Sequence, residues 1–402
     1  MTMNKRLLVL AAGILQLPII KRAKEMGCYV IAADGDSSAM GFAYADKAIC
    51  ANIVSEDEML KIAIDEKVDG VIHPCSEVSM AVMGRINEEM GLSGITREQA
   101  IKATNKHLMR QAFEAYGAPS PLSILTDSAD HAWDVFDAAF PGNAILKPSR
   151  NSGSRGIAKI HKGISKEEFV NLYDITLNES RDKSVLIEQF VEGPEFSVEI
   201  IVWDNKVNVL AVTDKKTTGA PHFVELGHNQ PSRFPEDIVT LVSDAAVAGV
   251  KALGVNACAC HAEVKVQDGK PYLMEVGARM GGDFISTVLT KLSSGVDMIA
   301  AAVNCALGIE PDLQPVEKGA GVCIRYFTPK PGLLNDVKNV EVLKHPSVFD
   351  SAIYCKAGDV VHDVTSSLCR CGHVIVTAET ADEAVELAEE LISSVEFETK
   401  YI

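Results

Sequence analysis

The first 74 residues alternate between short apolar runs and helical patterns, and this alternation constrains the fold more than any other feature. It predicts strand 7–11, helix 16–26, strand 29–34, helix 55–66 and strand 70–73. Parallel strands joined by crossover helices form a sheet that those helices cover. We therefore expect an α/β domain with a parallel sheet over residues 1–96.

The turn after the first strand bears on what this domain binds. It reads Ala11-Ala12-Gly13 and holds one glycine, whereas the dinucleotide fingerprint needs Gly-x-Gly-x-x-Gly. Asp34 and Asp36 end the second strand, where a carboxylate can hold a ribose. A dinucleotide-dependent oxidoreductase is therefore an alternative, although the incomplete loop argues against it.

Beyond residue 96 the order of elements changes and predicts α+β lobes. A capping box at Thr96 and Gln99 opens a helix over 97–116, and Gly117-Ala118-Pro119 ends it. Short strands with hairpin turns follow, and a long helix is expected at 235–253. The expected strands are 144–148, 156–161, 185–191, 196–203, 207–213, 261–266 and 272–276, with turns at Asp204-Asn205 and Asp268-Gly269.

The remaining segment predicts a small closing domain over 318–402. Its expected elements are strands 321–327, 352–355 and 373–377 and an amphipathic helix at 381–392. Between the first and last domains we expect a lobe with linker helices at 97–184 and a second lobe at 185–317. A chain of 402 residues is long enough for several such units.

The charge balance narrows the partners. The chain has 38 Lys and Arg against 55 Asp and Glu, a net charge of −17. Such a surface repels nucleic acid and anionic membranes. The apolar run 6–20 resembles a signal peptide, but no cleavage site follows it, and it is too short to span a bilayer. We therefore expect a cytoplasmic protein that acts on small molecules.

The ten cysteines lack the spacing of a disulfide framework, as expected for reduced thiols. Two clusters allow a metal interpretation, Cys258/Cys260/His261 and Cys369/Cys371/His373. Neither contains the Cys-x-x-Cys turn that zinc sites favour. Buried structural thiols are the preferred interpretation.

The segment 144–157 has the composition of a phosphate-binding loop between two strands. Its glycines permit close approach of a ligand to the backbone, its serines add donors, and Lys147 supplies a cation at the base. A flexible hairpin loop explains the same residues equally well. No Walker motif, Gly-x-x-x-x-Gly-Lys-Ser/Thr, occurs in the chain.

Glu263 and Glu275 are placed to form a cation site. They lie on opposite arms of the hairpin turned at Asp268-Gly269, so folding brings them near each other. Facing carboxylates are unfavourable without a cation, and hard oxygen ligands suit Mg²⁺. Arg279 follows closely and can help to hold an anion. The alternative is that each glutamate faces solvent separately.

In this order the segments resemble the ATP-grasp superfamily over essentially the whole chain. The resemblance implies a pre-ATP-grasp parallel-sheet domain, a two-lobed ATP-grasp domain and a small C-terminal domain. It makes Lys106 and Lys147 phosphate contacts and Arg279 the group that steadies the acyl phosphate. The resemblance also assigns roles to the remaining candidates. Ser152, Gly153, Ser154 and Gly156 would belong to a mobile loop over the phosphates, and Glu188, Gln189, Phe190 and Val191 to the hinge that binds adenine. Glu195 would contact the ribose, and Glu263 and Glu275 would bind magnesium.

One departure and one closer likeness refine this resemblance. Gly277 stands where much of the family has a magnesium-binding Asn, and water can replace that ligand. The pattern Glu-x-Gly-Ala-Arg-x-Gly-Gly, which ends at Gly281 and Gly282, is similar to that of carboxylate–amine ligases of the L-amino acid ligase type. The resemblance thus implies an enzyme that uses ATP and Mg²⁺, with Mn²⁺ as a substitute, and forms an amide through an acyl phosphate. It also implies a homodimer.

The acceptor site is expected near Arg279 and the loop 221–228. His222, Glu225 or His228 there could orient the acid or deprotonate the amine, and solvated histidines are an equal alternative. Other ATP-grasp chemistry, such as a bicarbonate-dependent carboxylase or a ligase of the purine-biosynthesis type, shares the nucleotide residues. A nucleotide-binding sensor without turnover is a further alternative.

Overall fold

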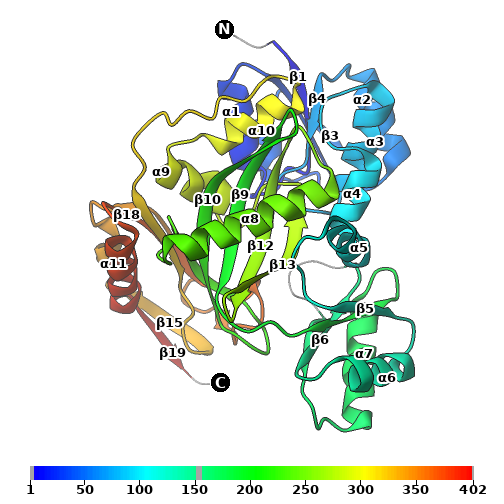
Figure 1. The fold of residues 1–402 in the computed structure, drawn as a ribbon. Helices are drawn as coiled ribbons and strands as arrows, with labels where there is room; N and C mark the ends of the chain where they lie inside the picture. Colours follow the sequence, from blue (N-terminus) through cyan, green and yellow to red (C-terminus); the bar gives the residue numbers. More distant parts are fainter. Residues whose placement is uncertain (1–3, 151–155, 401–402) are drawn as a thin grey trace.

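A computed structural model describes residues 4–150 and 156–400. Figure 1 shows three parts: an N-terminal α/β domain, a small lobe that projects from the body, and a large sheet that the C-terminal region extends. The mixed α/β architecture with one parallel sheet confirms the predicted fold class.

The N-terminal domain is a four-stranded parallel sheet in the order β3-β2-β1-β4. Its elements are β1 (Arg6–Leu10), α1 (Leu17–Glu25), β2 (Tyr29–Asp34), a short 3-10 helix (Met40–Ala43), β3 (Lys47–Cys50), α2 (Glu56–Asp65), β4 (Gly70–Ile72) and α3 (Met80–Met90). The Asp34 carboxylate accepts hydrogen bonds from the backbone N–H of Ala12 (2.7 Å) and of Asp36 (2.9 Å). The turn itself therefore uses the carboxylate that a dinucleotide ribose would need.

The helix predicted over 97–116 is two helices, α4 (Arg97–Thr104) and α5 (Lys106–Tyr116). The predicted capping box at Thr96 and Gln99 is present, but Asn105 between the helices has φ −115° and ψ 112° and ends α4. Its side chain accepts a hydrogen bond from the backbone N–H of Leu108 and so caps α5. The spacing of apolar residues could not predict this break, because apolar side chains are buried on both sides of it, in α4 and in α5.

The small lobe is an antiparallel sheet in the order β5-β8-β6-β7. Its strands are β5 (Ser123–Thr126), β6 (Ala144–Pro148), β7 (Ala158–Ile160) and β8 (Val185–Gln189), covered by α6 (Ala129–Ala139) and α7 (Lys166–Glu179). The rings of Trp133, Phe136 and Phe169 pack together between these helices. β8 therefore belongs to this lobe, although we placed the lobe's boundary at residue 184.

The large sheet has the order β13-β12-β9-β10-β11-β14-β18-β16. Its first five strands are β9 (Glu195–Trp203), β10 (Lys206–Thr217), β11 (Glu225–Gln230), β12 (Cys258–Gln267) and β13 (Lys270–Gly277). The predicted turns join β9 to β10 and β12 to β13, and Asp204, Asn205, Asp268 and Gly269 all have positive φ. α8 (Glu236–Leu253) crosses this part of the sheet (Figure 1).

The C-terminal region extends the same sheet and, as predicted, forms a small domain with hydrophobic clusters of its own. Beyond β11 the sheet continues with β14 (Gly321–Tyr326), then β18 (Gly372–Ala378) and finally β16 (Val348–Ile353). α11 (Ala381–Ser394) packs on β14 and β18. β15 (Gly332–Lys338), β17 (Val360–Val361) and β19 (Glu396–Lys400) form a second, three-stranded sheet. A π-helix (Ile285–Leu289), α9 (Thr290–Ser294) and α10 (Met298–Ala306) link β13 to β14, and two 3-10 turns (Val340–Lys344, Ser367–Cys369) complete the chain.

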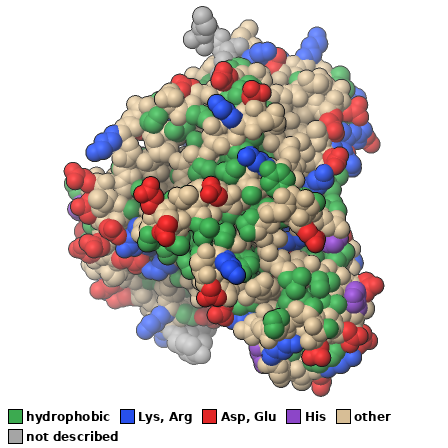
Figure 2. Space-filling view, in the orientation of Figure 1, with side chains coloured by type: hydrophobic (Ala, Val, Ile, Leu, Met, Phe, Trp, Pro, Cys, Tyr) green, Lys and Arg blue, Asp and Glu red, His purple; other side chains and the backbone are tan. Residues whose placement is uncertain are grey.

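The surface reflects the negative net charge. Figure 2 shows acidic side chains gathered at the left edge, over the part of the molecule where α11 lies. α11 alone carries five acidic residues, Asp382, Glu383, Glu386, Glu389 and Glu390. In the described part of the chain no helix is both long and apolar enough to cross a membrane.

The cap at Asn105 gives a first prediction. Replacing Asn105 by Ala removes the acceptor of the Leu108 N–H and should lower the free energy of unfolding by about 1 kcal/mol. Asn105→Asp retains an acceptor and should stay close to the wild type. Urea unfolding followed by circular dichroism measures both, and equal stability of the Ala and Asp variants would contradict the assigned cap.

Candidate active site

A cavity of about 310 Å³ lies between the small lobe, the large sheet and the loop that follows β13. Candidate residues from all of these segments line it. They are Lys106, Lys147, Gln189, Phe190, Val191, Glu195, Glu225, His228, Glu263, Glu275, Arg279 and Gly282. Segments far apart in the sequence thus converge on one site.

Other candidates lie elsewhere. His222 is exposed on the turn before β11 and does not line the cavity. Glu188 has no exposed surface and lies behind the cavity wall rather than in it. Gly156 and Gly281 do not line the cavity either. Ser152, Gly153 and Ser154 fall outside the described residues.

Glu263 and Glu275 face each other across the β12–β13 hairpin. They are direct partners in the strand register, and the register shifts immediately after Glu263. Lys215 Nζ lies 2.9 Å from Glu263, and Lys106 Nζ lies 3.1 Å from Glu275. Burial would raise the pKa of both glutamates, but the facing lysines hold each pKa below its usual value. Both carboxylates are therefore ionised and able to bind a cation.

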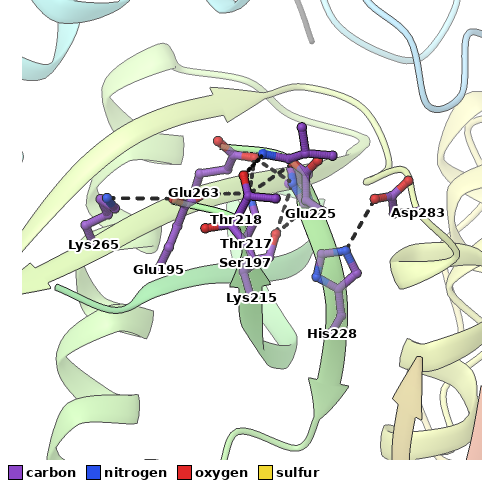
Figure 3. Close-up of polar contacts among 12 residues, drawn as sticks. Glu195, Ser197, Lys215, Thr217, Thr218, Glu225, His228, Glu263, Lys265 and Asp283 are labelled. Atoms are coloured by element: carbon purple, nitrogen blue, oxygen red, sulfur yellow. Dashed lines mark hydrogen bonds and ion pairs between the residues drawn. The ribbon is translucent and has the colours of Figure 1, made fainter. Parts of the chain in front are cut away.

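Lys215 is the centre of the polar network in Figure 3. Its Nζ contacts Glu195 at 2.6 Å, Glu263 at 2.9 Å and Glu225 at 3.8 Å. Burial alone would lower the pKa of Lys215, but these carboxylates outweigh it and hold that pKa well above its usual value. One buried cation thus connects the predicted ribose contact, a predicted metal ligand and a predicted acceptor residue.

The side of the cavity that we predict to hold the nucleotide is formed by the small lobe and the segment after β8. Lys147 extends from β6 and pairs with Glu188 at 2.7 Å. Phe190 lines the cavity, and the ammonium group of Lys159 lies 3.8 Å from the centre of its ring. An apolar ring in the wall of a cavity is suited to a flat heterocycle such as adenine.

Arg279 follows β13 and reaches back to the N-terminal domain. Its Nη2 lies 2.9 Å from Glu77, which belongs to the loop after β4. Burial and the nearby charge of Glu275 raise the pKa of Glu77, and Arg279 opposes the shift. A Cβ at Gly277 would come within 3.3 Å of Arg279 Nε, so Gly277 leaves room for the guanidinium group.

The side of the cavity predicted to hold the acceptor lies where the large sheet meets the C-terminal region. Arg370 forms two hydrogen bonds to Asp283, at 2.7 and 2.8 Å, and stacks on Tyr326 at 3.7 Å. His228 Nε2 lies 3.4 Å from the same carboxylate, as the dashed line in Figure 3 shows. Burial would raise the pKa of Asp283, but Arg370 and His228 hold it well below its usual value.

A buried network supports the floor of the cavity. His261 Nδ1 lies 2.5 Å from Glu199, and the Ser286 hydroxyl also bonds to Glu199. Burial would lower the pKa of His261, but Glu199 raises it to about 9. Gly281 packs against this network, because a Cβ there would lie 2.4 Å from His261 Nδ1.

Two atoms of the site have no hydrogen-bond partner within the described ranges. They are Nδ1 of His228 and Nε of Arg279, and both are buried. The same ranges hold no group of three or more His, Cys, Asp or Glu side chains placed to bind a metal ion. A cation at Glu263 and Glu275 would therefore have two protein carboxylates and would complete its shell with water or phosphate oxygens.

The sequence did not indicate several residues of the site. Glu77, Lys215 and Arg370 each form ion pairs that cross between segments distant in sequence. The partner of Arg370 is Asp283, for which the sequence left open a supporting or a purely structural role. Lys215 lies in a polar run, Lys215-Lys216-Thr217-Thr218, that reads as a solvated strand end. Only the sheet order β12-β9-β10 places it opposite Glu263, so no local signal could have identified it.

Two families account for most of the chain. Residues 140–288 match the ATP-grasp domain, and residues 325–400 match the L-amino acid ligase C-terminal domain 2. The chain therefore contains an ATP-grasp domain, as predicted, followed by a C-terminal domain of the L-amino acid ligase type.

Similar proteins include the alanine–anticapsin ligase of Bacillus subtilis, 28% identical over 64% of this chain and 58% of its own length. This chain spans less than two thirds of the length of these curated relatives. Among solved structures, the L-amino acid ligase of Bacillus licheniformis has a TM-score of 0.83 at 19% identity and covers 99% of both chains. Phosphoribosylglycinamide synthetase of Anaerococcus prevotii has a TM-score of 0.79 at 24% identity, covering 99% of this chain and 100% of its own.

The Asp283–Arg370 pair gives a prediction about pH. The pKa of Asp283 is depressed in the folded state, so its contribution to stability is present above the unfolded pKa of about 3.9 and is lost as the pH falls. Asp283→Asn should cost about 2 kcal/mol at pH 7, and the difference from the wild type should shrink below about pH 4.

Thermal unfolding between pH 3 and pH 7 measures this difference. Asp382→Asn is the control, because Asp382 pairs with Arg233 on the surface and should matter little at any pH. A deficit in Asp283→Asn that is constant across this range would contradict the assignment.

Proposed function

We propose that this protein is an ATP-dependent carboxylate–amine ligase that forms an amide or peptide bond and releases ADP and phosphate. The observation that carries the proposal is the pair Glu263 and Glu275, opposed across one hairpin, with Lys106, Lys147 and Arg279 around the same cavity. The two carboxylates can bind a metal cation, and the three positively charged side chains can bind phosphate oxygens. This arrangement of charges is the one that phosphoryl transfer requires.

ATP would bind with its adenine against Phe190 and the hinge backbone and its ribose at Glu195. The phosphates would then lie toward Lys106 and Lys147, which line the cavity between the lobes. Glu263 and Glu275 would hold Mg²⁺ or Mn²⁺, since their oxygens are the donors that such ions prefer. The bound cation would neutralise charge that builds on the transferred phosphoryl group.

The reaction would proceed in two transfers. The substrate carboxylate attacks the γ-phosphorus, the bond to the bridging oxygen of ADP breaks, and an acyl phosphate forms. The amine then attacks the acyl carbon, phosphate leaves with the bonding electron pair, and the nitrogen loses a proton. Arg279 would offset the negative charge at the acyl oxygen, because its Nε has no other partner in the described structure.

The amine would lie beside His228 and Glu225. Both line the cavity, and Nδ1 of His228 is buried without a partner among the described residues. Either side chain can orient an ammonium group or accept its proton. Three carboxylates lie at this wall, each within ion-pair distance of a basic side chain, and such a carboxylate can also pair with an approaching amino group. The pairs are Glu77 with Arg279, Glu225 with Lys215 and Asp283 with Arg370.

A ligase of the purine-biosynthesis type is the second candidate, because the synthetase from Anaerococcus prevotii shares the fold. Its acceptor would carry a phosphate, and the basic side chains at this wall, Lys215, Arg279 and Arg370, each already face a carboxylate.

We further propose that the protein acts as a homodimer, which light scattering of the purified chain would test.

A hydroxamate assay tests the reaction. Purified protein with Mg²⁺, ATP, hydroxylamine and a panel of carboxylates, amino acids included, should release ADP and form hydroxamate from a cognate acid. Glu275→Gln should abolish both products, because it removes a cation ligand. ATP binding without hydroxamate from any acid, and without ADP release when amines are added, would favour a nucleotide sensor.

The two histidines of the acceptor loop form a matched pair. His228→Ala should lower kcat/KM for the amine by about 100-fold, within the range for loss of a general base. His222→Ala should leave it unchanged, because His222 is exposed outside the cavity. Steady-state kinetics with the cognate amine measures both, and the reverse ranking would remove His228 from the mechanism.

A further inference from the structure

Three buried side chains form a charged group behind the phosphate side of the cavity. Lys147 Nζ lies 2.7 Å from Oε2 of Glu188, and Arg110 Nε lies 2.8 Å from Oε1 of the same carboxylate. Arg110 Nη2 lies 3.3 Å from Oε2. All three residues are nearly or fully buried: Glu188 is 0%, Arg110 5% and Lys147 7% exposed. They come from three elements, β6, α5 and β8.

The charges of this group do not cancel. Glu188 is the only acid within ion-pair distance of Arg110 or Lys147 in the part of the chain that the structure describes. Burial opposes ionisation of Glu188, but Arg110 and Lys147 together hold its pKa well below the usual range. Two cations share one carboxylate, so the group carries one net positive charge. Charges in such a buried place are weakly screened and act strongly on a nearby ligand.

Only Lys147 can bring this charge to a ligand. Its side chain lines the cavity, whereas Arg110 and Glu188 do not. Arg110 also donates a hydrogen bond of 2.8 Å from Nη2 to the carbonyl oxygen of Met274. The guanidinium group is thus held between the small lobe and β13, and its connection to Lys147 runs through the carboxylate of Glu188.

We propose that Arg110 is a positioning residue that keeps the positive charge of Lys147 available to the phosphates of ATP by sharing the carboxylate of Glu188. Without Arg110, Glu188 and Lys147 form a neutral pair, and a phosphate must compete with the carboxylate for the ammonium group. With Arg110, the carboxylate is balanced and Lys147 acts as a free cation. This inference rests on the proposed nucleotide site.

The geometry disfavours a direct role of Glu188 in nucleotide recognition. Both of its oxygens are engaged by Arg110 and Lys147, and no part of its surface is exposed. The sequence pattern placed Glu188 in the adenine-reading hinge, but only its neighbours Gln189, Phe190 and Val191 reach the cavity. Glu188 is therefore a partner of the phosphate lysine.

The test compares the binding of ATP with that of adenosine, a probe without phosphates. Calorimetry on the full chain with Mg²⁺ gives both dissociation constants. Arg110→Met should weaken ATP binding by about tenfold or more and leave adenosine binding unchanged. Arg110→Lys keeps the charge and should bind ATP within about threefold of the wild type.

The double variant separates charge from structure. Arg110→Met with Glu188→Gln removes one charge of each sign and restores the net positive charge at Lys147. ATP binding should recover to within about threefold of the wild type, whereas a merely structural role predicts a further loss. Arg325→Met is the matched control, because Arg325 is equally buried, pairs with Glu389 and lies outside the cavity. It should change neither dissociation constant.

The outcomes are distinct. No ATP binding by the wild type would remove the proposed function itself, whereas wild-type binding with unchanged ATP affinity in Arg110→Met would overturn only the present inference. Failure of the double variant to recover would also overturn it. If Arg110→Met does not fold, Glu188→Gln alone decides. It should bind ATP at least as tightly as the wild type, and weaker binding would contradict the proposal.

Discussion

The cavity depends on the pairing of ionised side chains that water reaches poorly. Each lysine that lines it lies within ion-pair distance of a carboxylate: Lys106 of Glu275, Lys147 of Glu188, Lys215 of Glu195 and Glu263, and Lys265 of Glu195. An unpaired charge in such a place costs several kcal/mol, so these pairs stabilise the charged lining of the cavity. Binding of a nucleotide and a cation would then replace these ion pairs. The lysines would contact the phosphates, and the glutamates would bind the cation.

The large sheet makes this exchange possible because it aligns charged residues on neighbouring strands. β12 lies between β9 and β13, so the partners of Glu263 are Ser197 on one side and Glu275 on the other. β10 lies beyond β9 and brings Lys215 to the same face. The C-terminal strands continue this sheet, and Arg370, which precedes β18, pairs with Asp283. Ser367 of the same region lines the cavity, so the C-terminal domain contributes directly to the site.

Local signals in the sequence were sufficient for part of this structure. The turn at Asp268-Gly269 determined which residues of the hairpin face each other, and it correctly predicted the pairing of Glu263 with Glu275. The capping box at Thr96 was equally local. α6 and α7 were missed, although each begins after a serine cap, Ser128 and Ser165, that was a local signal in the sequence. The positions of Glu188 and Lys215 depend on sheet order, which no local pattern encodes.

The single helix predicted over 97–116 is the most instructive error, because the break at Asn105 determines the direction of α5. Lys106 and Arg110 lie four residues apart and so project from the same face of α5. Lys106 contacts Glu275 on β13, and Arg110 contacts Glu188 on β8. The backbone N–H of Lys106 also donates to Ser149 at the end of β6. One short helix therefore fixes the small lobe against the large sheet through the charges that the site uses. If the helix continued in the direction of α4, Lys106 and Arg110 would not reach Glu275 and Glu188.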